Sequence, residues 1–167
     1  MMKILVTAAS KHGSTDEIAK AIGEELRRAG HTVDVIDVKE KPTPEAYDAA
    51  VVGSAIYVGN WMGDARDFVS EHQVALAKMP VWLFSSGPLG AEDPQPSGDP
   101  QQIDELIAQS KARGHQIFVG SLHKEKLGIA EKLVVKAVKA PYGDFRDWDA
   151  IRAWAREINA ALIPVAA

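Results

Sequence analysis

The sequence predicts an α/β domain with a parallel sheet, and three observations support this class. Short apolar segments rich in valine and isoleucine alternate with longer segments in which apolar residues recur at helical spacing, an order typical of βαβ units. Most of the short segments are apolar nearly throughout, as expected when helices cover both faces of a sheet. The chain has 167 residues, of which 46% are hydrophobic. That length suits one domain with a substantial core, so we expect a single domain over residues 1–167.

Five strands are expected from the apolar segments. They lie at Met2–Ala8, His31–Val38, Ala49–Ala55, Val81–Ser85 and Gln116–Ser121. The second strand alternates polar and apolar residues more than the others do, which places it at an edge of the sheet.

Helices with clear start or stop signals separate the strands. The first should run from about Thr15 to Ala29, because its apolar residues form one stripe and Gly30 supplies a stop. Ser14 followed by Glu17 has the spacing of a capping box, in which the two side chains accept from free backbone N–H groups. Further helices are expected at about Gly63–Lys78, from Asp99-Pro100 onward, and at Trp148–Leu162.

Two segments depart from this alternation. Residues 87–100 are rich in Gly, Pro, Asp and Ser, which predicts a long surface loop after the fourth strand. Residues 124–142 predict an extra amphipathic helix with lysines along one side. A basic helix can lie on anionic lipid, which would give peripheral contact with the inner membrane face through residues 124–139. A helix packed on the domain is favoured instead, because three lysines contribute only about 1 kcal/mol each at such a surface.

Composition excludes several classes of function. The formal charge of −4 provides no broad basic surface, so no nucleic-acid partner is expected. No apolar run reaches the roughly 18 residues of a membrane span, and no signal peptide precedes the first strand, so a cytoplasmic location is expected. The chain has no cysteine and therefore no thiolate metal site or cysteine nucleophile, and no metal is expected. Redox chemistry would need a bound organic cofactor.

A candidate anion site follows the first strand. The turn into the first helix consists of Ser10, Lys11, His12, Gly13, Ser14 and Thr15. Free N–H groups at the helix start, the helix dipole and the hydroxyls favour a phosphate there, and Gly13 lets the backbone come close. The chain contains neither Gly-x-x-x-x-Gly-Lys-Ser/Thr nor Gly-x-Gly-x-x-Gly, so nucleoside triphosphate and dinucleotide sites are disfavoured. The loop also fits a helix that is merely capped and binds nothing.

Three motifs resemble a known family. Ser10-x-x-Gly13-x-Thr15 after a first strand resembles the phosphate loop of the flavodoxins, with His12 where that family usually has a hydroxyl side chain. The segments 53–59 (Gly-Ser-Ala-Ile-Tyr-Val-Gly) and 143–155 (Gly-Asp-Phe-Arg-Asp-Trp-Asp-Ala-Ile-Arg-Ala-Trp-Ala) resemble the flavodoxin-domain proteins related to menaquinone-dependent protoporphyrinogen oxidase. The resemblance covers nearly the whole chain.

This resemblance implies a flavodoxin-like doubly wound fold, with five parallel strands in the order 2-1-3-4-5 and helices on both faces. It also implies FMN as the cofactor, held by its phosphate in the loop after the first strand and by its ring in the loops after the third and fourth strands. The residues expected at the ring are Ser54, Ala55, Ile56, Tyr57, Val58, Gly59, Asn60 and Trp61, with Ser85, Ser86, Gly87, Pro88 and Leu89.

Individual roles are expected for some of these residues. Tyr57 and Trp61 could stack on the isoalloxazine ring, and Gly59-Asn60 is a suitable place for a peptide whose hydrogen bond changes with the redox state of the flavin. His12 and His123 are the only histidines expected near the site, and Arg146 could face the flavin or an acidic substrate. No catalytic residues of the protein's own are expected, because the flavin carries the chemistry.

Two functions of different classes follow from the resemblance. In the first, an oxidoreductase takes hydrogen from a reduced organic substrate, such as a porphyrinogen, onto the flavin and passes it to a quinone. In the second, an electron carrier exchanges electrons with redox protein partners. The mild net charge favours the enzyme, because carriers that steer to basic partners tend to be strongly acidic. An interaction module without flavin stays open, whereas a phosphoacceptor domain is disfavoured because Ala8-Ala9 and Ser54-Ala55 stand where it would need aspartates.

Overall fold

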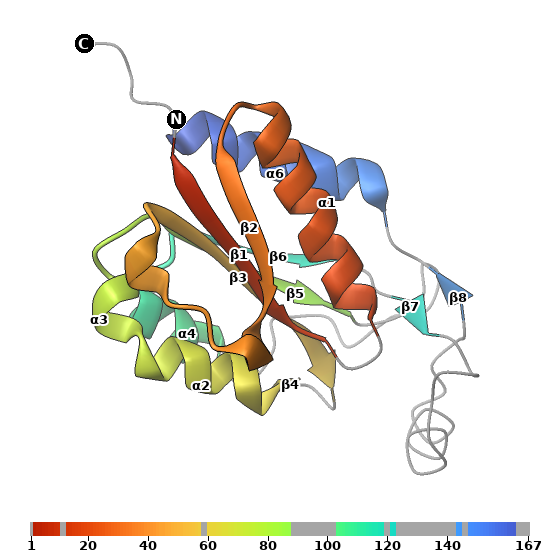
Figure 1. The fold of residues 1–167 in the computed structure, drawn as a ribbon. Helices are drawn as coiled ribbons and strands as arrows, with labels where there is room; N and C mark the ends of the chain where they lie inside the picture. The colour runs from red at the N-terminus through yellow and green to blue at the C-terminus, as the bar shows by residue number, and fades with distance from the viewer. Residues whose placement is uncertain are drawn as a thin grey trace.

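The protein folds around a parallel sheet (Figure 1). The computed structural model describes residues 2–10, 13–57, 60–87, 103–118, 121–122, 143–144 and 147–162. Within these ranges the sheet has five parallel strands in the order β2-β1-β3-β5-β6, and the short β4 pairs antiparallel with β3. The strands are β1 (Lys3–Ala9), β2 (Thr32–Asp37), β3 (Ala49–Tyr57), β4 (Asn60–Trp61), β5 (Val81–Ser86) and β6 (Gly114–Phe118). This order confirms the predicted topology, with β2 at an edge.

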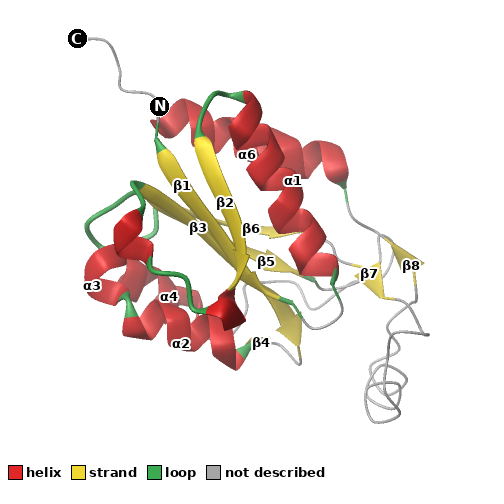
Figure 2. Cartoon of the chain, viewed as in Figure 1, coloured by secondary structure: helices red, strands yellow, loops and turns green. Residues whose placement is uncertain are grey.

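Helices cover both faces of the sheet, as predicted (Figure 2). One face carries α1 (Ser14–Arg28) and α6 (Trp148–Leu162). The other carries α2 (Gly63–Glu71), α3 (Gln73–Leu76) and α4 (Ile103–Ser110). Two short 3-10 turns, η1 (Val38–Glu40) and η2 (Pro44–Ala46), connect β2 to β3. Successive side chains of β1 enter alternate core clusters, because side chains of a strand point to opposite faces.

The first helix begins one residue earlier than predicted, and the predicted capping box is wrong. Gly13 is the N-cap, with a left-handed φ of 88°, and Ser14 is the first helical residue. Glycine adopts this conformation without strain but has no side chain that could accept from the first turn. At the other end, Gly30 has a φ of 102° and donates to the Arg27 carbonyl at 2.9 Å, which confirms the predicted stop.

Three further boundaries differ from the prediction. The helix expected over residues 63–78 is divided into α2 and α3 at His72, whose ring packs on Phe68 with 4.9 Å between ring centroids. No glycine or proline marks this break. β6 begins at Gly114, earlier than predicted, because pairing with β5 extends the strand toward its N-terminus. Ser121 does not belong to β6. It belongs to the short β7 (Ser121–Leu122), which pairs with β8 (Gly143–Asp144).

Some predictions concern residues outside the described part of the chain. They include the helix start at Asp99-Pro100, most of the loop 87–100, and the extra helix at 124–142 with its membrane contact. Among the described residues, the structure contains no helix with both the length and the apolar composition of a membrane span.

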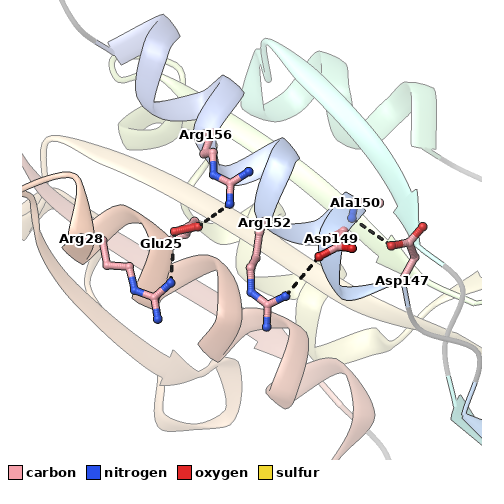
Figure 3. Close-up of polar contacts among 7 residues, drawn as sticks. All are labelled: Glu25, Arg28, Asp147, Asp149, Ala150, Arg152 and Arg156. Atoms are coloured by element: carbon pink, nitrogen blue, oxygen red, sulfur yellow. Dashed lines mark hydrogen bonds and ion pairs between the residues drawn. The ribbon is translucent and has the colours of Figure 1, made fainter.

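One ion pair drawn in Figure 3 joins α1 to α6 on one face of the sheet, and each of the other two lies within a single helix. Glu25 of α1 accepts from Arg156 of α6 at 3.1 Å and lies 3.7 Å from Arg28. The Glu25 side chain is only 8% exposed, so these cations compensate a carboxylate that has lost most of its water. In α6, Arg152 pairs with Asp149, and the Asp147 carboxylate accepts from the Ala150 N–H at 3.0 Å and caps the helix. The contact between Glu25 and Arg156 helps to hold α1, the helix that follows the candidate phosphate loop.

Replacement of Thr7 by valine is expected to stabilise the protein. Thr7 lies in the middle of β1 with no exposed surface, and its hydroxyl has no hydrogen-bond partner among the described residues. A buried hydroxyl without a partner costs about 1 kcal/mol or more, and valine has nearly the same shape without that group. Chemical denaturation of Thr7→Val should therefore give a free energy of unfolding about 1 kcal/mol higher than that of the wild type.

Ser110→Ala provides the control for this measurement. Ser110 is equally buried, but its hydroxyl donates to the Leu106 carbonyl at 2.8 Å. Removal of this satisfied hydroxyl should lower the free energy of unfolding. A loss of stability in Thr7→Val as well would show that the Thr7 hydroxyl has a partner elsewhere in the chain.

Candidate functional site

Three segments predicted to bind a cofactor meet at one edge of the sheet. They follow the carboxyl ends of β1, β3 and β5, which are neighbours in the sheet. In the register of these strands, Ser54 is the partner of both Ala9 and Ser85, and Ala55 is the partner of Ser86. Parallel sheets of this architecture bind ligands beyond the carboxyl ends of their strands, so the meeting point is a suitable binding site.

Ser10 and Gly13, the described residues of the loop after β1, form a candidate anion cradle with the start of α1. The Ser10 hydroxyl accepts from the Gly13 N–H at 2.9 Å, and the Gly13 carbonyl receives the first helical hydrogen bond, from Glu17 N–H at 3.2 Å. The first N–H groups of an α-helix have no partner within the helix, so α1 presents donors and the positive end of its dipole here. A Cβ at Gly13 would meet no atom of the described residues within 4 Å, its chain neighbours aside, so the described part of the protein leaves space beside this backbone.

Other members of the predicted phosphate loop contribute less to the described geometry. Thr15 is almost completely buried. Lys11 and His12 lie outside the described residues, as does the side chain of Ser14. The role of these three in binding phosphate stays a prediction.

The structure corrects the stacking role predicted for Trp61. Its side chain is only 1% exposed and belongs to the core cluster beneath α2. The indole N–H donates to the Ser85 hydroxyl at 2.7 Å, which fixes the ring inside the protein. The sequence alone does not distinguish a tryptophan that stacks on a ligand from one that packs in the core. In this fold the large apolar ring of Trp61 is buried in the core. The backbone of Trp61 remains beside the site through its pairing with Ile56.

The remaining residues of the segment after β3 have different environments. Ala55 and Ile56 are partly exposed at the end of β3 and can contact a ligand. Ser54 is fully buried, and its hydroxyl accepts from the Met62 N–H at 2.9 Å and donates to the Ala55 carbonyl at 2.9 Å. Asn60 forms β4 with Trp61. The Tyr57 side chain, Val58 and Gly59 lie outside the described residues.

The segment after β5 leaves the sheet through a glycine. Gly87 has a φ of 111°, and its N–H donates to the Phe118 carbonyl at 2.8 Å, which joins the end of β5 to β6. Ser85 and Ser86 are both buried. A ligand would therefore contact Ser85 and Ser86 through their backbone groups and not through their side chains. Pro88 and Leu89 lie outside the described residues.

One histidine near the site was missed. His115 Nε2 lies 2.7 Å from the Ser85 hydroxyl, directly beneath the site. The sequence prediction considered His12 and His123 alone, because the fifth strand was expected to begin at Gln116. Only the pairing of β5 with β6 places His115 beside Leu83, on the same face as Ser85. His12 and His123, like Arg146, lie outside the described residues.

An acidic side chain lies beside the anion cradle. Burial raises the pKa of Asp16, in the first turn of α1, above its ordinary value, and the nearby Asp37 carboxylate raises this pKa further. Lys20 and Lys39 oppose the shift. The helix dipole also favours a negative charge at this position, but burial outweighs it. The negative charge of Asp16 is thus disfavoured in the folded protein, and a bound phosphate would disfavour it more.

Comparisons with known proteins agree with this geometry. The family model described as "Flavodoxin domain" matches residues 5–149. The chain is 27% identical to protoporphyrinogen IX dehydrogenase [quinone] of Escherichia coli K12, over 94% of each chain.

Solved structures show the same fold at lower sequence identity. Oxidised flavodoxin 1 of Bacillus cereus is 18% identical, with a TM-score of 0.62 over 96% of this chain and 99% of that one. The flavodoxin of Streptococcus pneumonia TIGR4 is also 18% identical, with a TM-score of 0.59 and the same coverage of 96% and 99%.

Proposed function

Because the chain belongs to the flavodoxin domain family, whose cofactor is FMN, we propose that it is an FMN-dependent oxidoreductase. In this proposal a reduced organic substrate of the porphyrinogen class gives hydrogen to the flavin, and a quinone accepts it. The observation that carries the proposal is the relationship to the E. coli protoporphyrinogen dehydrogenase, which spans 94% of both chains. A shared domain alone would support many chemistries, whereas similarity along the whole chain includes the segments around the site.

The described residues fit FMN in charge and shape. The phosphate would be held by the loop from Ser10 to Thr15, where N–H groups of the α1 N-terminus and open space beside Gly13 suit a dianion. The ring would lie between the segments 54–61 and 85–89, where backbone N–H and carbonyl groups can reach its polar rim. Bound there, FMN would supply the electron and hydrogen acceptor of the reaction.

The chain's own residues have the task of binding and orientation. Buried Ser54, Trp61 and Ser85 maintain the shape of the site through hydrogen bonds within the protein. Gly13 and Ser10 shape the cradle that fixes the phosphate end. No side chain of the protein needs to act as a nucleophile, because the reactive atoms belong to the cofactor and the substrate.

The alternative function is that of an electron carrier. Two solved structures that match the chain along nearly its whole length are flavodoxins. The formal charge of only −4 argues against a pure carrier, because it provides little long-range attraction to a basic redox partner.

A steady-state assay separates the two functions. The full chain, reconstituted with FMN, is mixed with protoporphyrinogen and a menaquinone analogue, and porphyrin formation is followed by fluorescence. We expect turnover that requires both FMN and quinone and that exceeds the rate with free FMN. A yellow protein that exchanges electrons with redox proteins but gives no turnover above free FMN would support the carrier and contradict the enzyme.

Replacement of Asp16 by asparagine is expected to raise stability at neutral pH. A carboxyl whose pKa is raised in the folded state lowers the free energy of unfolding when it is ionised. This loss is absent below the ordinary pKa of 3.8, grows as the pH rises from there to the raised pKa, and is complete above it. The advantage of Asp16→Asn over the wild type should therefore be present at pH 7 and disappear as the pH falls toward 4, as measured by denaturation at several pH values.

The same variant tests the position of the phosphate. Removing a negative charge from the first turn of α1 should tighten FMN binding by about threefold at pH 7, an effect typical of one screened charge. Glu24→Gln, an exposed position farther along α1, is the matched control and should leave the dissociation constant unchanged. Equal effects of the two variants would contradict the placement of the phosphate beside Asp16.

A further inference from the structure

Two buried serines lie side by side beneath the proposed ring site. Ser54 on β3 and Ser85 on β5 are partners in the parallel register, and both are 0% exposed. Register partners on neighbouring strands point to the same face, and Leu83, two residues before Ser85, packs in the core cluster beneath α2. The two hydroxyls therefore lie together on that face of the sheet.

Both hydroxyls hold the same short segment. Trp61 Nε1 donates to Ser85 Oγ at 2.7 Å, and the Met62 N–H donates to Ser54 Oγ at 2.9 Å. Trp61 ends β4, which pairs with the end of β3, and Met62 is the N-cap of α2. Figure 1 shows β4 at the carboxyl end of β3, next to the start of α2. The serine pair thus holds Trp61 and Met62 in place between β4 and the start of α2.

The contact at Ser85 continues to the next strand. His115 Nε2 on β6 lies 2.7 Å from Ser85 Oγ. The indole N–H can only donate, so Ser85 Oγ accepts from Trp61 and retains its own hydrogen or its second lone pair for His115. One hydroxyl therefore ties together β4, β5 and β6, and its removal would leave a buried indole N–H without its acceptor.

We infer that Ser54 and Ser85 are positioning residues for the flavin ring, which act by fixing β4 relative to the end of β5. This inference rests on the proposed function, in which the ring lies between the segments 54–61 and 85–89. The two hydroxyls bind protein groups and not the cofactor, so they set the separation of the two segments. The phosphate cradle lies in the loop after β1 and is shaped by Ser10 and Gly13, which, among the described residues, do not bond to either hydroxyl of this pair.

Ser85→Ala tests the inference, with Ser110→Ala as the matched control. Ser110 is also 0% exposed, and its hydroxyl also has two partners, the Leu106 carbonyl at 2.8 Å and the Ala112 N–H at 3.2 Å. It lies at the end of α4 and belongs to none of the three segments of the proposed site. The full chains are titrated with FMN and riboflavin, and the midpoint potential of the bound flavin is measured by spectroelectrochemistry.

We expect Ser85→Ala to weaken FMN and riboflavin by the same factor, about tenfold, which is the effect of one lost buried hydrogen bond. The ratio of the two dissociation constants should stay at the wild-type value, because the phosphate contacts are intact. The ratio of affinities for oxidised and fully reduced FMN, obtained from the potential, should change by about threefold or more. Ser54→Ala should change both quantities in the same direction, and Ser110→Ala should change neither.

A second variant removes the donor instead of the acceptor. Trp61→Phe retains a large ring but has no N–H, so in this background Ser85→Ala should change FMN affinity by less than about twofold. If Ser85→Ala alone does not fold, the comparison in the Trp61→Phe background and the Ser54→Ala variant test the inference instead. Affinities and potentials of Ser85→Ala equal to those of Ser110→Ala would overturn the inference and leave the proposed function intact. A wild-type chain that binds no FMN would overturn the proposed function and the inference with it.

Discussion

FMN is expected to bind this protein about 100-fold more tightly than riboflavin, because the phosphate contributes two or three charge-assisted hydrogen bonds at the α1 N-terminus. The two ligands share the same ring and differ only in the phosphate, so the ratio of their dissociation constants isolates the cradle. Quenching of flavin fluorescence on titration measures both constants. A ratio near one would show that the loop after β1 does not bind the phosphate.

Gly13→Val should abolish most of this discrimination. Gly13 has a φ of 88°, which a β-branched residue adopts only with strain, and the backbone there must come close to the phosphate. FMN affinity of the variant should fall toward that of riboflavin, a loss of about 100-fold, while riboflavin affinity stays unchanged.

Gly30→Val is the matched control for Gly13→Val. Gly30 has a φ of 102° at the opposite end of α1, and a Cβ at either glycine would meet no atom of the described residues within 4 Å, chain neighbours aside. Both variants should therefore lose stability through backbone strain, by about 1 to 2 kcal/mol. Only Gly13→Val should lose affinity for FMN. Equal losses of affinity in the two variants would assign the effect to helix stability and not to phosphate binding.

Gly53→Ala is expected to cause the largest loss of stability among single-atom additions to the core. Gly53 lies in β3 opposite Phe84 of β5, and an added Cβ would overlap the Phe84 ring. Phe84 cannot move aside easily, because it is fully buried and its ring packs against Phe118 and Trp154. Overpacking of this kind costs about 3 kcal/mol. Chemical denaturation should report this decrease.

A compensating substitution distinguishes steric overlap from other causes. Phe84→Leu removes the outer part of the ring, so Gly53→Ala should cost much less in that background than in the wild type. Gly63→Ala is the control, because a Cβ at this position would approach only the end of the Arg66 side chain, at 3.9 Å. Similar costs of Gly53→Ala in the wild type and in the Phe84→Leu background would contradict the steric explanation.

Much of the fold could be predicted because its signals are local. Apolar runs located β1, β3 and β5, and helical spacing located α1 and α6, the latter with both of its predicted ends. Gly30 marked the end of α1 through its backbone conformation alone. The order of the strands came from resemblance to the flavodoxins, and the structure confirms it. No such local signal marks the break between α2 and α3 at His72, and for that reason the sequence predicted one continuous helix there.

The site was predicted less completely than the fold. The strands β1, β3 and β5, which precede the three predicted segments, are parallel neighbours and therefore end at the same edge of the sheet. The error at Trp61 and the omission of His115 have a common origin, since both side chains bond to Ser85, which lies 24 and 30 residues away along the chain. Periodicity reports which residues are apolar, but it does not report which partner a polar group finds.

The sequence by itself determined the class of fold and the positions of most elements, because periodicity and glycine conformation act over a few residues. It also predicted the loop that we propose as the phosphate site. Only the tertiary structure decided that Ser54 and Ser85 bond to protein groups and that Trp61 is buried. These contacts depend on which strands are neighbours and on their register, and a shift of one residue would turn each side chain to the opposite face.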